Sequence, residues 1–145
     1  MTSLTQSQRQ ELAAIRRALD GYIPTIATST VAVNDNLPIL RAWKPRSYAV
    51  GDVRMYEGIP YRCTQAHDSA SNTGWTPPTV PALWMQYHGT SAATARPWVQ
   101  PLGAHDMYKV GEYMVWTDAQ TYKCAQDTTY TPAALPGAWA QIPAQ

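Results

Sequence analysis

Apolar residues recur at helical spacing near the beginning of the chain. Four of them are separated by three, four and three positions: Leu12, Ile15, Leu19 and Tyr22. Polar and small residues fill the positions between them, so the apolar stripe is narrow and similar to the seam of a coiled coil. The pattern predicts an N-terminal helix over residues 1–22.

Side chains at the start of this segment fit a capping box. Thr5 with Gln8, and Ser7 with Gln10, each place a hydroxyl three residues before an amide, and such a pair satisfies free backbone N–H groups. A lone helix of this length is marginal in water. We therefore expect the apolar stripe to be buried between copies of the chain or against a host assembly. The alternative is an ordinary helix that packs on its own domain.

The following segment, residues 23–40, reads IPTIATSTVAVNDNLPIL. Its two prolines and its many β-branched residues disfavour a helix. The sequence predicts an extended linker here, or a lone strand that pairs elsewhere.

The rest of the chain contains an internal repeat. YAVGD from Tyr48 aligns with YKVGE from Tyr108, and YRCTQ from Tyr61 aligns with YKCAQ from Tyr122. Further along, WTP aligns with YTP, and a tryptophan follows in both copies. Such alignment of aromatic, glycine and proline positions indicates a duplication.

Each copy has the pattern of short strands. Glu57-Gly58 separates two β-rich runs, which is typical of a hairpin. The predicted fold class is mainly β: an N-terminal helix and an extended linker, followed by two small three-stranded antiparallel β modules in tandem. The modules are expected at residues 41–88 and 95–142.

The two cysteines occupy equivalent places in the repeat. Along an extended strand, Tyr61 and Cys63 point to one face, as do Tyr122 and Cys124. We expect both to be small, buried, reduced core residues, one in each module. A bridge between them would require the two cores to open toward each other.

Composition excludes several classes of partner. The chain of 145 residues carries 11 Lys+Arg against 10 Asp+Glu, so it has no basic stripe for a nucleic-acid backbone. No apolar run approaches the roughly 18 residues that suggest a membrane span. The N-terminus lacks the pattern of a secretory signal, so we expect synthesis in the cytoplasm and no standard secretion. Six Trp and nine Tyr, with no Phe, suit either half-buried core rings or rings that face a ligand.

Catalytic and metal-binding patterns are weak. His67-Asp68 and His105-Asp106 do not occupy equivalent positions in the repeat, and two such pairs do not make a metal site. Asp52 and Glu112 are equivalent carboxylates at turns, where capping of backbone N–H groups explains them better than glycoside hydrolysis. The sequence predicts no enzyme, no cofactor and no metal.

The module pattern resembles a known family. The motif AW…Y.VGD…Y.G..Y.C.QAH…GWTP…LW, over residues 42–84, resembles the small chitin- and cellulose-binding modules of carbohydrate-binding families five and twelve. Those are three-stranded β modules found on chitinases and cellulases. Residues 95–139 look like a diverged second copy. With the polar helix in front, the layout is similar to small proteins encoded in phage and prophage structural regions.

This resemblance implies a function. It suggests a non-enzymatic, virion-associated structural or accessory protein of a tail, baseplate or head fibre, made in the host cytoplasm, that displays carbohydrate-binding-like modules for host attachment. Its partners would be other virion proteins, copies of itself, with a trimer favoured, and bacterial surface polysaccharide. The alternative is a chitin- or cellulose-binding module of a polysaccharide-degrading system.

The resemblance also directs the choice of candidate sugar-binding residues. In sugar-binding members, exposed aromatic residues directly follow the Tyr-x-Ala strand, whereas this chain has Gln-Ala in the first copy and Gln-Asp in the second. The candidates that could replace them are Trp75, Tyr130, Tyr87 and Trp98. The alternative for Trp75 and Tyr130 is that each ring merely covers its own module.

Overall fold

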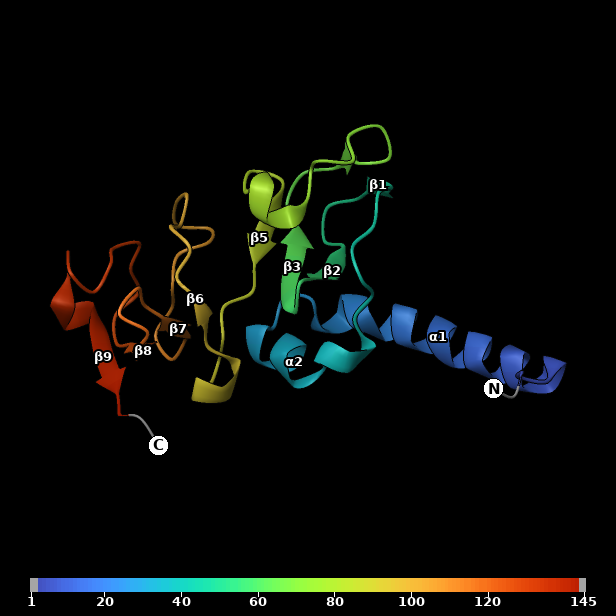
Figure 1. The fold of residues 1–145 in the computed structure, drawn as a ribbon, viewed down its shortest axis with the longest axis horizontal. Coiled ribbons are helices and arrows are strands. Elements are labelled where there is room, and N and C mark those ends of the chain that lie inside the picture. The colour runs from blue at the N-terminus through green and yellow to red at the C-terminus, as the bar shows by residue number, and fades with distance from the viewer. Residues whose placement is uncertain (1–2, 144–145) are drawn as a thin grey trace.

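The computed structural model describes residues 3–143, and its fold is mainly β with N-terminal helices and several small sheets (Figure 1). The helices are α1 (Gln6–Ile26) and α2 (Thr30–Asp35), followed by a 3-10 turn at Leu37–Ile39. Helix α1 projects from one end of the molecule, and two groups of strands follow each other along its length. Within residues 3–143, no helix has the length and apolar character that crossing a membrane requires.

The predicted N-terminal helix is present, although its limits differ from the prediction. Of the predicted range, residues 1 and 2 lie outside the described part of the chain. Helix α1 begins after Thr5, whose hydroxyl accepts a hydrogen bond from the Gln8 backbone N–H (3.0 Å), while Gln8 Oε1 accepts one from the Thr5 N–H (2.8 Å). The predicted Thr5–Gln8 capping box is therefore confirmed. The helix passes through Pro24 and ends at Ile26.

The prediction of an extended linker over residues 23–40 is wrong. The segment contains the last turn of α1, all of α2 and the 3-10 turn. Ser29 starts α2, because its hydroxyl accepts a hydrogen bond from the Ala32 N–H (3.1 Å). Three of the β-branched residues that argued against a helix, Ile23, Ile26 and Val33, are buried. Burial of a large apolar side chain stabilises by about 1.5–3 kcal/mol, which exceeds their helix-propensity penalty of at most about 0.7 kcal/mol.

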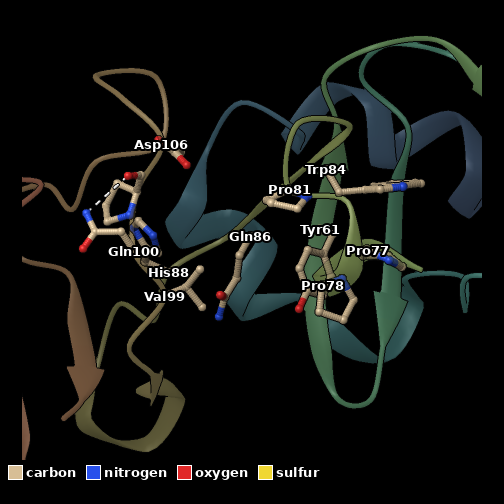
Figure 2. A pocket seen from close by; sticks show the side chains of 11 residues that line it. Tyr61, Pro77, Pro78, Pro81, Trp84, Gln86, His88, Val99, Gln100 and Asp106 are labelled. Atoms are coloured by element: carbon tan, nitrogen blue, oxygen red, sulfur yellow. Dashed lines mark hydrogen bonds between the residues drawn. The ribbon is translucent and has the colours of Figure 1, made fainter. Parts of the chain in front are cut away.

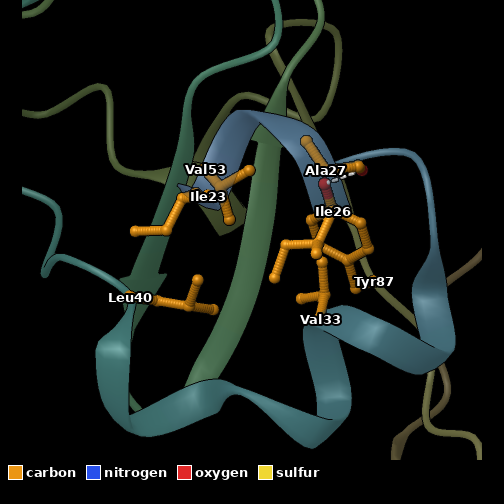
Figure 3. Close-up of a cluster of buried hydrophobic side chains, with 7 residues drawn as sticks. All are labelled: Ile23, Ile26, Ala27, Val33, Leu40, Val53 and Tyr87. Carbon is orange, nitrogen blue, oxygen red and sulfur yellow. Dashed lines mark hydrogen bonds between the residues drawn. The ribbon is translucent and has the colours of Figure 1, made fainter. Parts of the chain in front are cut away.

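That buried cluster joins the helices to the first group of strands (Figure 3). It contains the following residues: Ile23, Ile26, Ala27, Val33, Leu40, Val53 and Tyr87. The Tyr87 hydroxyl also donates a hydrogen bond to the Ala27 carbonyl. The end of α1 and the whole of α2 therefore belong to one core with the β structure.

Module 1 (residues 41–88) contains the predicted three-stranded antiparallel sheet. Its strands are β1 (Ser47–Tyr48), β2 (Val53–Tyr56), β3 (Ile59–Cys63), β4 (His67–Asp68) and β5 (Trp84–Gln86). The sheet has the order β2-β3-β5, and β1 pairs separately with β4. The predicted hairpin is confirmed at Glu57-Gly58, where both residues have positive φ values of 50° and 79°, as a two-residue type I′ turn requires.

Module 2 (residues 95–142) differs from the predicted three-stranded sheet by one additional strand. Its strands are β6 (Arg96–Pro97), β7 (Tyr113–Val115), β8 (Thr121–Cys124) and β9 (Trp139–Ile142), in that order within one sheet. Strand β6 runs parallel to β7, and β7, β8 and β9 are antiparallel. In module 1 the corresponding place holds only an isolated parallel bridge between Ala42 and Met55.

The two equivalent carboxylates cap turns in the same way. Asp52 Oδ2 accepts a hydrogen bond from the Ala49 N–H (2.9 Å), and Glu112 Oε1 accepts one from the Lys109 N–H (2.8 Å). The glycine before each carboxylate has a positive φ, 94° in the first module and 91° in the second. The predicted capping role is therefore confirmed at both turns.

Both cysteines are free and buried, as predicted. Cys63 Sγ donates to the Gln65 carbonyl at 3.1 Å, and Cys124 Sγ donates to the Gln126 carbonyl at 3.0 Å. Burial raises the pKa of the Cys63 thiol, and it raises that of Cys124 to about 11. The repeated thiol therefore closes the turn after each central strand while filling the core beneath it.

A buried polar network, called here the junction network, connects both modules and α2. The Arg96 guanidinium donates to the Tyr87 carbonyl (2.7 Å) and to Asn34 Oδ1 (2.6 Å). The Asn34 amide in turn donates to the His88 carbonyl (2.9 Å), and His88 Nδ1 lies 2.8 Å from Glu112 Oε1. All five residues are buried, so the network fixes how the two modules meet.

Candidate carbohydrate-binding site

Trp75 presents the most exposed indole ring of the candidate residues in module 1. It lies between β4 and the 3-10 turn Pro77–Thr79, and 40% of its surface is exposed. The His67 ring lies under it, with the ring centroids 6.4 Å apart and tilted by 50°. His67 is held in turn, because its Nδ1 lies 2.7 Å from the Gln65 carbonyl oxygen.

Asp68 holds the loop that carries Trp75. Its carboxylate accepts hydrogen bonds from the Ala70 N–H (2.8 Å) and the Ser71 hydroxyl (3.0 Å), and its carbonyl accepts one from the Asn72 amide (2.8 Å). The Ser71 hydrogen bond, followed by that of Ala70, lowers the pKa of Asp68. The Trp75 N–H then donates to the Asn72 carbonyl (3.0 Å). The His-Asp pair thus positions an aromatic ring.

Tyr130 occupies the equivalent turn of module 2 and is more exposed, at 60%. Its backbone is held at both ends: its N–H donates to the Thr128 hydroxyl (2.9 Å), and its carbonyl accepts from Trp139 Nε1 (2.9 Å). The phenol ring extends from this fixed backbone into solvent. Trp75 and Tyr130 are thus both available for stacking.

The other two candidates have different places. Tyr87 is only 3% exposed and belongs to the core that α1 and α2 share with module 1, so the prediction that it contacts sugar is wrong. The sequence places Tyr87 directly after a strand and does not reveal that helices α1 and α2 cover it.

Trp98 is half-buried. Its ring stacks on that of Tyr108, with the ring centroids 4.9 Å apart and the planes 13° apart, and it meets the Trp116 ring edge-on at a centroid distance of 5.6 Å. Trp98 therefore packs at the edge of the hydrophobic core of module 2.

A groove on module 2, about 390 Å³ in volume, was not predicted. Its aromatic and proline walls are Trp116, Tyr122, Pro132, Pro136 and Trp139. The Tyr122 hydroxyl donates to an Asp118 carboxylate oxygen (2.8 Å), which raises the pKa of Tyr122. The repeat alignment contained the aromatic members of this groove, but their residue type alone does not distinguish a groove from a core.

The predicted oligomerisation residues lie on the projecting part of α1. Leu12, Ile15 and Tyr22 are about half exposed, at 51%, 48% and 45%, and Leu19 is intermediate. Near the point where α1 meets module 1, Asp20 pairs with both Arg41 and Arg16, and their hydrogen bonds hold the pKa of Asp20 well below its usual range.

The second His-Asp pair also has a local role. Asp106 accepts hydrogen bonds from the backbone N–H groups of Leu102 and Gly103, each at 2.9 Å, and His105 lies 3.8 Å away. Among the residues that the structure describes, no three His, Cys, Asp or Glu side chains are grouped as a metal ion would need.

Comparison with known proteins identifies the part of the chain that holds Trp75. Residues 42–85 match carbohydrate-binding module family 5/12. Streptogrisin-C of Streptomyces griseus is 50% identical over 40 residues, which are 28% of this chain and 8% of that protein. Chitinase A1 of Niallia circulans is 38% identical over 60 residues, which are 41% of this chain and 8% of that protein. The chain thus covers only a small part of both relatives. Residues 42–85 are a carbohydrate-binding domain of this type.

Proposed function

We propose that the protein binds a chitin-type polysaccharide through module 1, with the Trp75 ring as its main contact surface. The observation that carries this proposal is a 40% exposed indole on a loop held by Asp68 and His67, within the segment that matches the carbohydrate-binding family. A flat ring held rigidly offers the C–H face of a pyranose a stacking surface at little cost in side-chain entropy. The similarity to a chitinase supports chitin as the polymer.

Module 2 supplies a second ring in this proposal. The positions directly after the central strand of module 1 are Gln65 and Ala66, both exposed and neither aromatic. One indole alone gives a small contact. Tyr130 lies on the equivalent turn of module 2 with its backbone equally fixed, so we propose that module 2 is a diverged copy that adds this ring.

The properties of helix α1 support a non-catalytic role for the two modules. Its exposed apolar stripe is not covered within the described residues, and the helix projects away from both modules (Figure 1). We propose that the protein is a non-enzymatic accessory component that α1 attaches to a larger assembly. A phage tail, baseplate or head fibre, in which three copies bury the stripe together, is the second candidate, and this exposed stripe is the observation that favours it.

Sedimentation with insoluble chitin and with cellulose tests the sugar-binding proposal. We expect the wild type to sediment with chitin, and the Trp75→Ala variant to bind about tenfold more weakly, because a lost aromatic contact is worth about 0.5–1.5 kcal/mol beyond its buried area. Val31→Ala is the control, since it truncates an exposed apolar side chain of α2 that lies outside both modules and outside the apolar stripe of α1. Equal sedimentation of the wild type and Trp75→Ala would contradict the proposal.

A further inference from the structure

A cleft lies between the two modules (Figure 2), and Trp75 is not among the residues that line it. One wall comes from module 1 and the other from the segment that follows β6 in module 2. The main apolar lining residues are Tyr61, Pro77, Pro78, Pro81, Val99 and Pro101. The cleft is partly open to solvent, and like many small-molecule sites it combines apolar walls with a few polar groups.

Gln86 provides the polar group in this cleft. It lies on β5 directly opposite Tyr61 of β3, is only 9% exposed, and its side chain reaches between Val99 and Tyr61 (Figure 2). Its Oε1 atom is buried and has no hydrogen-bond partner among the described residues. A buried carbonyl oxygen that has lost water without gaining a partner destabilises the fold. A ligand with a hydrogen-bond donor would remove this cost.

The corresponding glutamine of module 2 behaves differently. Gln141 lies on β9 opposite Tyr122 of β8, in the same relation as Gln86 to Tyr61. It is exposed, and its amide donates to Gln120 Oε1 at 3.3 Å. A glutamine at this position of the third antiparallel strand therefore does not always have an unpartnered side-chain oxygen. The unpartnered oxygen occurs where the second module closes over the first.

The charges at the edge of the cleft already have partners. His88 Nδ1 lies against Glu112 Oε1, and the Asp106 carboxylate accepts hydrogen bonds from two backbone N–H groups. The walls are otherwise apolar or uncharged. A ligand for this cleft must therefore be neutral, with apolar faces and a group that matches a primary amide, which has one acceptor oxygen and two donor hydrogens.

We propose that this cleft binds one ring of an N-acetylated sugar, with the Gln86 amide paired to the acetamido group. An acetamido group offers an N–H to Gln86 Oε1 and a carbonyl to Gln86 Nε2, while its methyl group and the ring C–H face meet the proline and valine walls. This inference rests on the proposed sugar-binding function. It adds a second site, selective for the acetamido substituent and suited to a chain end rather than to a polymer surface.

Titration of the full chain with soluble N,N′-diacetylchitobiose tests this site, with cellobiose as the matched ligand that lacks acetamido groups. We expect calorimetric binding of the first sugar only. Gln86→Leu should weaken it at least about tenfold, because two hydrogen bonds are lost, whereas Gln141→Leu should leave it unchanged. Equal binding of the two sugars, or equal effects of the two substitutions, would overturn the proposal.

Two further measurements separate this site from the Trp75 surface and from a structural role of Gln86. Trp75→Ala should lose sedimentation with chitin but keep binding of the soluble sugar, and Gln86→Leu should do the reverse. Gln86→Leu should also unfold at the same or a higher temperature than the wild type, because it removes an unpartnered polar group; a clearly lower temperature would show a structural role and overturn the proposal. Val99→Trp, which narrows the cleft from the opposite wall, should abolish binding of the soluble sugar without altering Gln86.

Discussion

Replacement of Arg96 by methionine should destabilise the protein strongly, because Arg96 is the centre of the junction network. Its side chain is buried, and it donates hydrogen bonds to the Tyr87 carbonyl and to Asn34 Oδ1. Methionine retains the length and apolar contacts of the stem but removes both donors. Burial lowers the pKa of Arg96, so the guanidinium already carries a desolvation cost that these two acceptors offset.

The magnitude follows from those two hydrogen bonds. Hydrogen bonds to charged groups contribute about 1.5–3 kcal/mol each, and methionine leaves both neutral acceptors buried without this donor. We therefore expect Arg96→Met to lower the free energy of unfolding by about 3–5 kcal/mol. The matched control is Arg41→Met: Arg41 precedes Trp43 by two residues, as Arg96 precedes Trp98. Among the described residues, the exposed Arg41 guanidinium pairs only with Asp20 on α1, so its loss should change stability little.

Urea denaturation, followed by tryptophan fluorescence, measures both variants against the wild type. The slope of the free energy against urea concentration reports the surface that unfolds in one step. If the junction network joins the two modules into one cooperative unit, Arg96→Met should lower this slope or split the transition. A variant that unfolds as a single transition with the stability of Arg41→Met would refute the reasoning.

Two further predictions concern the cysteines and helix α1. The thiols of Cys63 and Cys124 should react slowly with a thiol reagent in native protein and completely after unfolding in the absence of a reductant; two missing thiols would contradict the free state. Because burial raises the pKa of Cys124 from 9.0 to about 11, its thiol ionises first in the unfolded chain, so this contribution to stability is complete below pH 9 and is lost as the pH rises toward 11. Replacement of Ile15 and Leu19 by Asp should convert an oligomer into monomers in light scattering while the modules stay folded; identical monomers for wild type and variant would disprove an oligomerising role for α1.

The features that the sequence predicted well depend on nearby residues. The Thr5–Gln8 capping box and the Glu57-Gly58 hairpin use interactions that span only a few positions. The placement of Cys63 on a buried strand face follows from simple alternation along an extended chain. For such elements, residue type and spacing contain most of the physical information.

The features that the sequence missed depend on contacts between distant segments. The segment 23–40 is helical because Ile26 and Val33 are buried against module 1, and no pattern within that segment reveals the neighbouring sheet. Tyr87 is covered by α1 and α2 for the same reason. In the candidate site, Trp75 and its Thr-Pro neighbours are visible in the sequence, whereas the cleft around the unpartnered Gln86 oxygen needs residues of both modules.

The buried junction network determines how the proposed sugar-binding rings of the two modules lie relative to each other. Modules joined by a flexible linker search for two sites independently, and their combined avidity depends on linker length. Here Arg96, Asn34 and His88 hold the modules in one orientation, so the spacing between the Trp75 and Tyr130 rings is set by the fold. A ligand that repeats at that spacing, such as the ordered face of a crystalline polymer, gains the full benefit of bivalent binding, whereas a single loose chain must bend to reach both rings. If the proposed function holds, selectivity for the physical state of the polymer is set by the fixed orientation of the two modules rather than by either binding surface alone.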